Sequence, residues 1–179
     1  MSAIMPRGTR QLLLPASPGF IWLSILFALL ANFVENFYFG GSVAWLPDFL
    51  ALTLVFWNIH QPRRIGMGVA FFFGLIMDVH QTTLLGQHAL CYSLLSFMAI
   101  TVHRRVLWFK TLTQAVHLLP LFVAAHLVEL SLHLLFGHAW PSWHLLLAPV
   151  LESLLWPFAS FLLLMPQHRS PDPDANRPL

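Results

Sequence analysis

The spacing of the basic residues constrains this chain more than any other feature of its sequence. Lys and Arg are absent from residues 11–62, 65–103 and 111–168. Each of these gaps can hold two apolar helices of roughly 17–20 residues, the length that crosses the hydrocarbon core of a bilayer. Hydrophobic residues make up 58% of the chain, charged residues 9%, and the mean hydropathy is +0.71. These values are typical of an integral membrane protein, and the sequence therefore predicts an all-α membrane fold.

Three gaps with two spans each predict six transmembrane helices arranged as three hairpins. The expected spans are residues 20–39, 46–59, 65–78, 84–102, 112–136 and 145–165. All nine basic residues then lie on one side of the membrane, and the positive-inside rule makes this side and both termini cytoplasmic. The second and third spans are short, so they are expected to borrow flanking residues, thin the bilayer or lie inside the bundle.

The chain is expected to contain one transmembrane domain, residues 1–166. Residues 167–179, which are rich in Pro and Asp, are predicted to form a disordered cytoplasmic tail. Tryptophans near the span ends are expected to form an interfacial belt, as such residues do at membrane surfaces. They are Trp22, Trp45, Trp57, Trp108, Trp140 and Trp143.

Residues 68–90 carry the clearest functional signal. An apolar run with two glycines ends at Asp78, a polar stretch follows at 79–83, and a second apolar run begins at Leu84. This pattern predicts a tight helical hairpin whose turn reaches an interface or a polar cavity, because lipid offers no partner to backbone or carboxylate. Three roles remain open for Asp78: to cap the following helix, to pair with a histidine, or to accept hydrogen bonds from another protein.

The acidic residues within the predicted spans gather on one side. One carboxylate alone could reach the interface or pair with a nearby His or Asn, whereas several together favour a shared polar cavity or a partner's contact surface. On the fifth span, His126, Glu129 and His133 share one helix face. The candidate cavity or partner-contact residues are Glu35, Asp48, Asp78, His126, Glu129, His133 and Glu152.

No metal site, cofactor or catalytic residue is expected. The spacing of His126, Glu129 and His133 could suit a metal ion, but the chain has no H-E-x-x-H motif, and His117 points roughly opposite to His126. A hydrogen bond between helices explains these residues better. No serine lies in a nucleophile-elbow motif. The sequence therefore predicts a protein that is not an enzyme, and no nucleic-acid partner is expected.

Small and aromatic residues mark expected helix contacts. Glycines let two backbones approach closely, and in lipid such packing supplies much of the association energy. The predicted helix-packing positions are Pro47, Gly66, Gly74, Gly86, Trp156 and Pro157.

Several short motifs carry a resemblance to a known family. They are Pro47-Asp48, Phe56-Trp57, the run from Phe73 to Asp78, Leu85-Gly86, Ala89-Leu90 and Leu155-Trp156-Pro157. In these motifs the sequence resembles the MreD family of rod shape-determining proteins, and the resemblance covers most of the chain. Leu46 stands where many members have Arg, so no role that needs a cation there is implied.

The resemblance implies a non-enzymatic scaffold in the bacterial cytoplasmic, or inner, membrane. MreD-like proteins are thought to act with the bitopic MreC, the actin-like MreB, and the polymerase RodA with its transpeptidase. They would link the cytoskeleton to peptidoglycan synthesis and cell shape, with membrane lipid as a further contact. One alternative stays open: six short spans around a polar cavity also resemble the substrate-binding subunit of energy-coupling-factor transporters, which would bind a vitamin-like small molecule.

Overall fold

The computed structural model describes residues 16–39, 46–81, 84–136 and 146–167. Within these segments the chain forms six α-helices, one short 3-10 helix and no strand. They are α1 (Pro18–Phe39), α2 (Phe49–His60), α3 (Met67–Gln81), α4 (Gln87–Val106), α5 (Thr111–Leu135), α6 (Leu147–Leu164) and η2 (Met165–Gln167). The all-α prediction is confirmed, and each helix overlaps its predicted span. Apart from Gln167, the predicted tail lies outside the described residues.

The chain is a membrane protein by the length and composition of its helices. α1, α5 and α6 are each long and apolar enough to cross a membrane, while α2 and α3 are shorter apolar helices. Large apolar side chains cover the outside of the described bundle, for example Phe27 at 72% and Phe158 at 65% exposed. Such a surface suits lipid, whereas a water-soluble protein rarely exposes large contiguous apolar areas.

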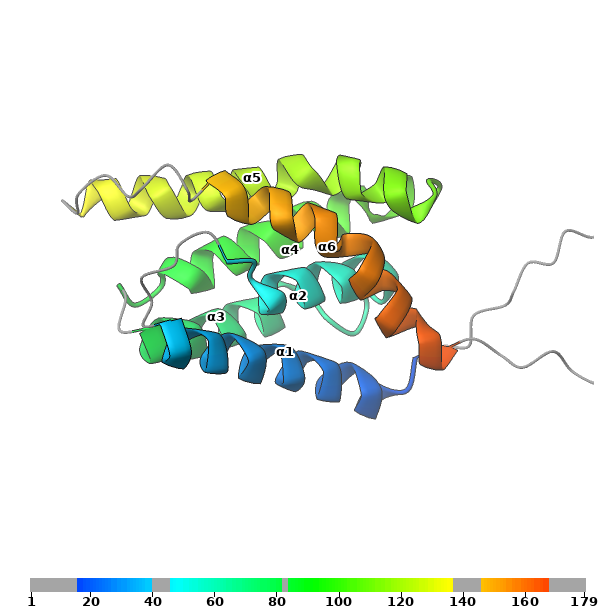
Figure 1. Cartoon of the computed structure of the whole chain (residues 1–179), viewed down its shortest axis with the longest axis horizontal. Helices are drawn as coiled ribbons and strands as arrows, with labels where there is room; N and C mark the ends of the chain where they lie inside the picture. Colours follow the sequence, from blue (N-terminus) through cyan, green and yellow to red (C-terminus); the bar gives the residue numbers. More distant parts are fainter. Residues whose placement is uncertain (1–15, 40–45, 82–83, 137–145, 168–179) are drawn as a thin grey trace, which may run out of the picture.

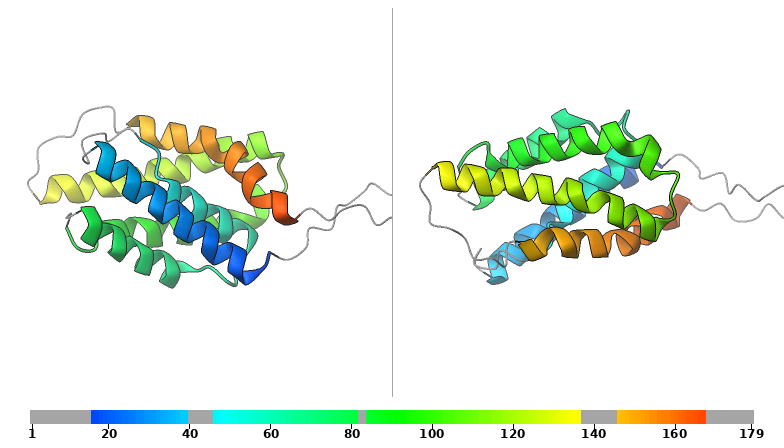
Figure 2. Two further views of the ribbon diagram at one scale, coloured as in Figure 1. Left: turned by 60° about the horizontal axis from the view of Figure 1, so that its bottom comes forward. Right: turned by 90° about the horizontal axis from the view of Figure 1, so that it is seen from above.

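Successive helices run in opposite directions (Figure 1). α1, α3 and α5 run one way, and α2, α4 and α6 run the other. As a result, residues 61–66 and 103–110 lie at the same end of the bundle as the start of α1 and the end of α6 (Figures 1 and 2). We call residues 61–66 and 103–110 the basic end, because they carry Arg63, Arg64, Arg104, Arg105 and Lys110.

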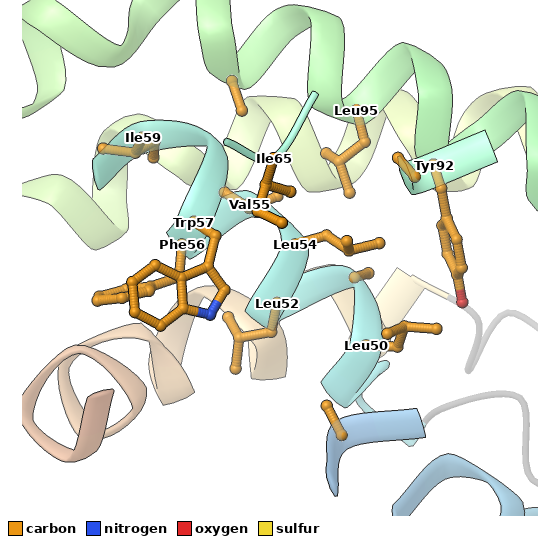
Figure 3. Packing of buried hydrophobic residues seen from close by; sticks show 14 of the residues in the cluster. Leu50, Leu52, Leu54, Val55, Phe56, Trp57, Ile59, Ile65, Tyr92 and Leu95 are labelled. Carbon is orange, nitrogen blue, oxygen red and sulfur yellow. The ribbon is translucent and has the colours of Figure 1, made fainter. Parts of the chain in front are cut away.

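α2 forms the centre of the hydrophobic core. It packs against α1, α4 and α6, and all its residues from Leu50 to Ile59 are buried (Figure 3). A helix of 12 residues is only about 18 Å long, which is shorter than the hydrocarbon core. Of the three arrangements expected for the short second span, the structure shows the helix inside the bundle.

One tryptophan of the expected interfacial belt lies elsewhere. Trp57 is fully buried in the core, where its Nε1 donates to Ser24 Oγ at 2.8 Å, so its predicted interfacial place is wrong. By contrast, Trp22 and Trp108 are 50% and 89% exposed. Trp45, Trp140 and Trp143 lie outside the described residues.

Of the three glycines predicted to lie at close helix contacts, only Gly74 does so. A Cβ atom built at Gly74 would lie 2.4 Å from Ala89 Cα, so α3 and α4 touch backbone to backbone there. At Gly66 and Gly86 an added Cβ would meet nothing within 4 Å, so the close packing predicted for these two glycines is wrong. Gly86 has a φ of +102°, a left-handed conformation that glycine adopts at little cost.

The other predicted packing residues lie where helices meet. Pro47 is buried just before α2. Trp156 is fully buried, packs on Phe56, and donates through Nε1 to Gln114 Oε1 of α5 at 3.1 Å. Pro157 lies inside α6, and a proline there removes one helical hydrogen bond and favours a bend. α6 is visibly bent (Figure 1).

Candidate functional site

Polar side chains from all six helices meet in the half of the bundle away from the basic end. They come from α1, the residue that caps α2, the end of α3, the start of α4, the outer part of α5 and the start of α6. We call this set the polar network: Asn32, Asp48, Asp78, His88, Tyr92, His126, Glu129 and Glu152. Five of its members were predicted as cavity or partner-contact residues.

Asp48 and Asn32 together hold the start of α2. Asp48 Oδ1 accepts hydrogen bonds from Ala51 N at 2.9 Å and from Asn32 Nδ2 at 2.7 Å. Asn32 Oδ1 accepts from Phe49 N at 3.1 Å, and the Tyr92 hydroxyl donates to Asp48 Oδ2. The first N–H groups of a helix have no partner within the helix, so this arrangement satisfies them where lipid could not.

Glu152 joins α2, α5 and α6. It is only 1% exposed, and its Oε1 accepts a hydrogen bond from Asp48 N at 3.1 Å. The same oxygen lies 3.1 Å from His126 Nε2. His126 Nδ1 lies 3.4 Å from Glu129 Oε2, without the geometry of a hydrogen bond. The histidine thus lies between two carboxylates, one on its own helix and one on α6.

Asp78 closes the hairpin of α3 and α4. Its two carboxylate oxygens accept from Gly86 N at 2.8 Å, His88 N at 2.7 Å and Ala89 N at 3.4 Å. His88 Nδ1 lies 2.9 Å from Asp78 Oδ1, and His88 Nε2 lies 4.0 Å from Glu129 Oε1. Since Gly86 has no side chain to cap α4, the preceding helix supplies the cap. Of the three open roles, helix cap and histidine partner are both present.

The remaining candidates lie at the margin of the network. Glu35, one turn beyond Asn32 in α1, is partly exposed and interacts electrostatically with Asp48. His133 lies two turns beyond His126 on α5 and is also partly exposed. A separate contact ties α1 to α3, since Asn36 Nδ2 lies 3.2 Å from His80 Nδ1 and the Phe33 ring stacks on the His80 ring.

Sequence reasoning missed Asn32, His88 and Tyr92. Each is a polar residue within an otherwise apolar helix, and this was the available signal, because such residues in lipid require partners. Their actual partners depend on how the helices cross. Figure 3 shows Tyr92 at the edge of the apolar core, with its hydroxyl directed away from Leu95.

The network borders a small, partly open cavity between α2, α4, α5 and α6. Its volume is about 20 Å³, and its polar lining consists of Asp48, His88, Tyr92, His126, Glu129 and Glu152. This is room for about one water molecule, whereas small-molecule sites usually measure roughly 300–1,000 Å³. A vitamin-sized ligand does not fit there. Within the described segments, no group of three or more His, Cys, Asp or Glu side chains is arranged to hold a metal ion.

The members of the polar network interact with other groups of the same chain. Each of its carboxylates has at least one donor or histidine from the chain itself, as given above for Asp48, Asp78, Glu129 and Glu152. Apart from His126 Nδ1, which has no hydrogen-bond partner among the described residues, these contacts are of the kind that rigidifies a fold in a low-dielectric interior. The geometry therefore supports a brace that ties the six helices together.

Replacing Tyr92 by Phe tests one link of this brace. The change keeps the ring and removes the hydroxyl that donates to Asp48. We expect the free energy of unfolding to fall by about 1–3 kcal/mol, because a buried acceptor loses its donor. Tyr38→Phe is the matched control, since Tyr38 is 77% exposed. Thermal unfolding of both purified variants measures the difference, and equal melting temperatures would show that the hydroxyl contributes nothing.

Comparison with known proteins gives one consistent match. The family model described as rod shape-determining protein MreD matches residues 16–166. The rod shape-determining protein MreD of Haemophilus influenzae is 31% identical over 121 residues, which covers 65% of this chain and 72% of that protein. No solved structure matches the chain, so the similarity to energy-coupling-factor transporters stays a prediction.

Proposed function

The chain belongs to the MreD family of rod shape-determining proteins, and on this basis we propose that it is a non-enzymatic scaffold of the bacterial rod-shape machinery. It would span the cytoplasmic membrane six times with both termini in the cytoplasm. Its role would be to couple the MreB cytoskeleton to peptidoglycan synthesis.

One structural observation supports a scaffold over a transporter or an enzyme. The buried polar groups that could serve chemistry or ligand binding are instead engaged with one another, and the cavity they line measures only about 20 Å³. A substrate site needs a larger opening with polar groups directed at the ligand. A scaffold needs a fixed arrangement of helices, which the polar network supplies.

The proposed partners are an MreC-like bitopic protein and, through the same complex, MreB, RodA and its transpeptidase. The apolar outer faces of the helices give a single transmembrane helix a surface on which to pack. Association in lipid depends on such close packing and on hydrogen bonds between helices.

Depletion of the protein in a rod-shaped host tests the proposal. We expect the cells to become round, the wild-type chain to restore rods, and an MreC-like protein to co-purify after mild crosslinking. Extraction of the same purified protein should yield no stoichiometric small molecule. Cells that keep their rod shape, or a bound vitamin at one molecule per chain, would contradict the scaffold.

Reporter fusions test the proposed topology. Fusions after Arg64 and Arg105 are expected to report a cytoplasmic location, because the basic end carries the described Lys and Arg residues. Fusions within residues 40–45, 82–83 and 137–145 are expected to report a periplasmic location. A periplasmic signal at Arg64 would exclude the six-span topology.

A further inference from the structure

Within the described residues, the basic end presents exposed cations and contains no carboxylate. Arg63, Arg64, Arg104, Arg105 and Lys110 are all exposed. The acidic residues of the described segments lie toward the ends of their helices that are away from the basic end, and they are Glu35, Asp48, Asp78, Glu129 and Glu152. Of the five cations, Arg64 also donates to the Ala16 carbonyl at 2.8 Å. The described charged residues of this end, 61–66 and 103–110, are therefore all basic.

Hydrogen bonds and a ring contact hold the turn between α4 and α5. Leu107 N donates to His103 O at 3.1 Å, Trp108 N to Arg105 O at 3.2 Å, and Phe109 N to Val106 O at 3.1 Å. On the α5 side, Gln114 Nε2 donates to Phe109 O at 3.0 Å, and the Phe109 ring stacks on His117 with centroids 4.2 Å apart. The backbone of residues 107–109 is thus held by the chain itself.

This turn nevertheless directs large apolar side chains outward. Trp108 is 89% exposed, and Leu107 and Phe109 are 43% and 42% exposed. Arg104 and Arg105 come before them, separated from Leu107 by the buried Val106, and Lys110 follows Phe109. Trp favours the headgroup level of a bilayer, and the long stems of Arg and Lys let their charges reach that same level. Residues 104–110 thus place exposed apolar side chains close in sequence to three exposed cations.

We propose that residues 104–110 form a binding surface for the headgroups of anionic phospholipids. Arg104, Arg105 and Lys110 would contact the phosphates, with Arg suited to paired hydrogen bonds and Lys acting as a point charge. Trp108 and Leu107 would enter the boundary between headgroups and acyl chains. Charge complementarity selects this occupant, because the surface offers three cations and no carboxylate. The inference does not depend on the proposed scaffold function.

The test uses the full-length protein in nanodiscs made from equal amounts of phosphatidylglycerol and phosphatidylcholine. After gentle extraction, native mass spectrometry counts the lipids retained on the protein. We expect phosphatidylglycerol to be retained about fivefold or more over phosphatidylcholine, since each basic residue near an anionic surface contributes severalfold. High salt should reduce this preference by screening the charges.

Two variants decide the outcome. The triple variant Arg104→Gln, Arg105→Gln, Lys110→Gln is expected to lose the preference, while the double variant Arg104→Lys, Arg105→Lys keeps its charges and should retain most of it. Melting temperatures in detergent verify that both variants fold. The same enrichment in the triple variant, no enrichment in the wild type, or loss of enrichment in the charge-conserving variant would each overturn the proposal.

Discussion

Replacement of Gly74 by Ala is expected to destabilise the protein severely. The added Cβ would lie 2.4 Å from Ala89 Cα and 2.6 Å from Ala89 N, and both of these are backbone atoms. Since no side chain can move aside, α3 and α4 would have to separate. Overpacking in a well-packed interior costs about 1–3 kcal/mol and sometimes more, and backbone contact places this change at the upper end or beyond. The measurement is the amount of folded protein in the membrane together with its melting temperature.

Gly68→Ala is the matched control for this prediction. Gly68 lies in the same helix, and a Cβ there would meet nothing within 4 Å. Alanine favours helix over glycine by up to about 1 kcal/mol, so this variant should be as stable as the wild type or slightly more stable. Equal stability of the Gly74 and Gly68 variants would show that α3 and α4 are not in backbone contact.

The second large effect is expected from Asp78→Asn. Asn keeps one acceptor oxygen but replaces the other by an amide nitrogen, which would face N–H groups that now donate to the carboxylate. Leaving buried donors unpaired costs about 1–3 kcal/mol, and more where a charged acceptor is lost. We therefore expect a lower melting temperature and less folded protein, because the start of α4 loses its cap.

Two further variants put this result in context. Asp48→Asn should have a milder effect, since an amide oxygen can still accept from Ala51 N at the start of α2. Glu35→Gln should change the melting temperature little, because Glu35 is partly exposed at the margin of the network. If Asp78→Asn were as stable as Glu35→Gln, the carboxylate of Asp78 would not be needed for the hairpin.

The sequence predicts the number and order of the helices well, because a helix that crosses a membrane needs a long apolar run without Lys or Arg. Two starts differ by three residues for local reasons. The second helix begins at Phe49 because Asp48 caps it, and the fourth begins at Gln87 because Gly86 adopts a positive φ. Neither geometry is visible in hydropathy alone.

The arrangement of the helices is what the sequence leaves open. Nothing in the composition of the second span distinguishes a central helix from a lipid-facing one, so Trp57 could not be placed in the core before the fold was known. For the same reason the pairing of Asn32 with Asp48, and of His88 with Asp78, could not be predicted. A polar residue in an apolar helix indicates that it has a hydrogen-bonding partner. Which residue is the partner depends on how the helices cross.

We infer that the polar network belongs to the scaffold's own fold and is not the surface that its partner binds. The most direct test is the amount of MreC-like partner recovered per folded molecule of the Asp78→Asn protein, measured beside its melting temperature. If the network serves the fold, the melting temperature should fall and the recovery per folded molecule should stay unchanged, because Asp78 is only 1% exposed and caps α4. An unchanged melting temperature with reduced partner recovery would contradict this inference.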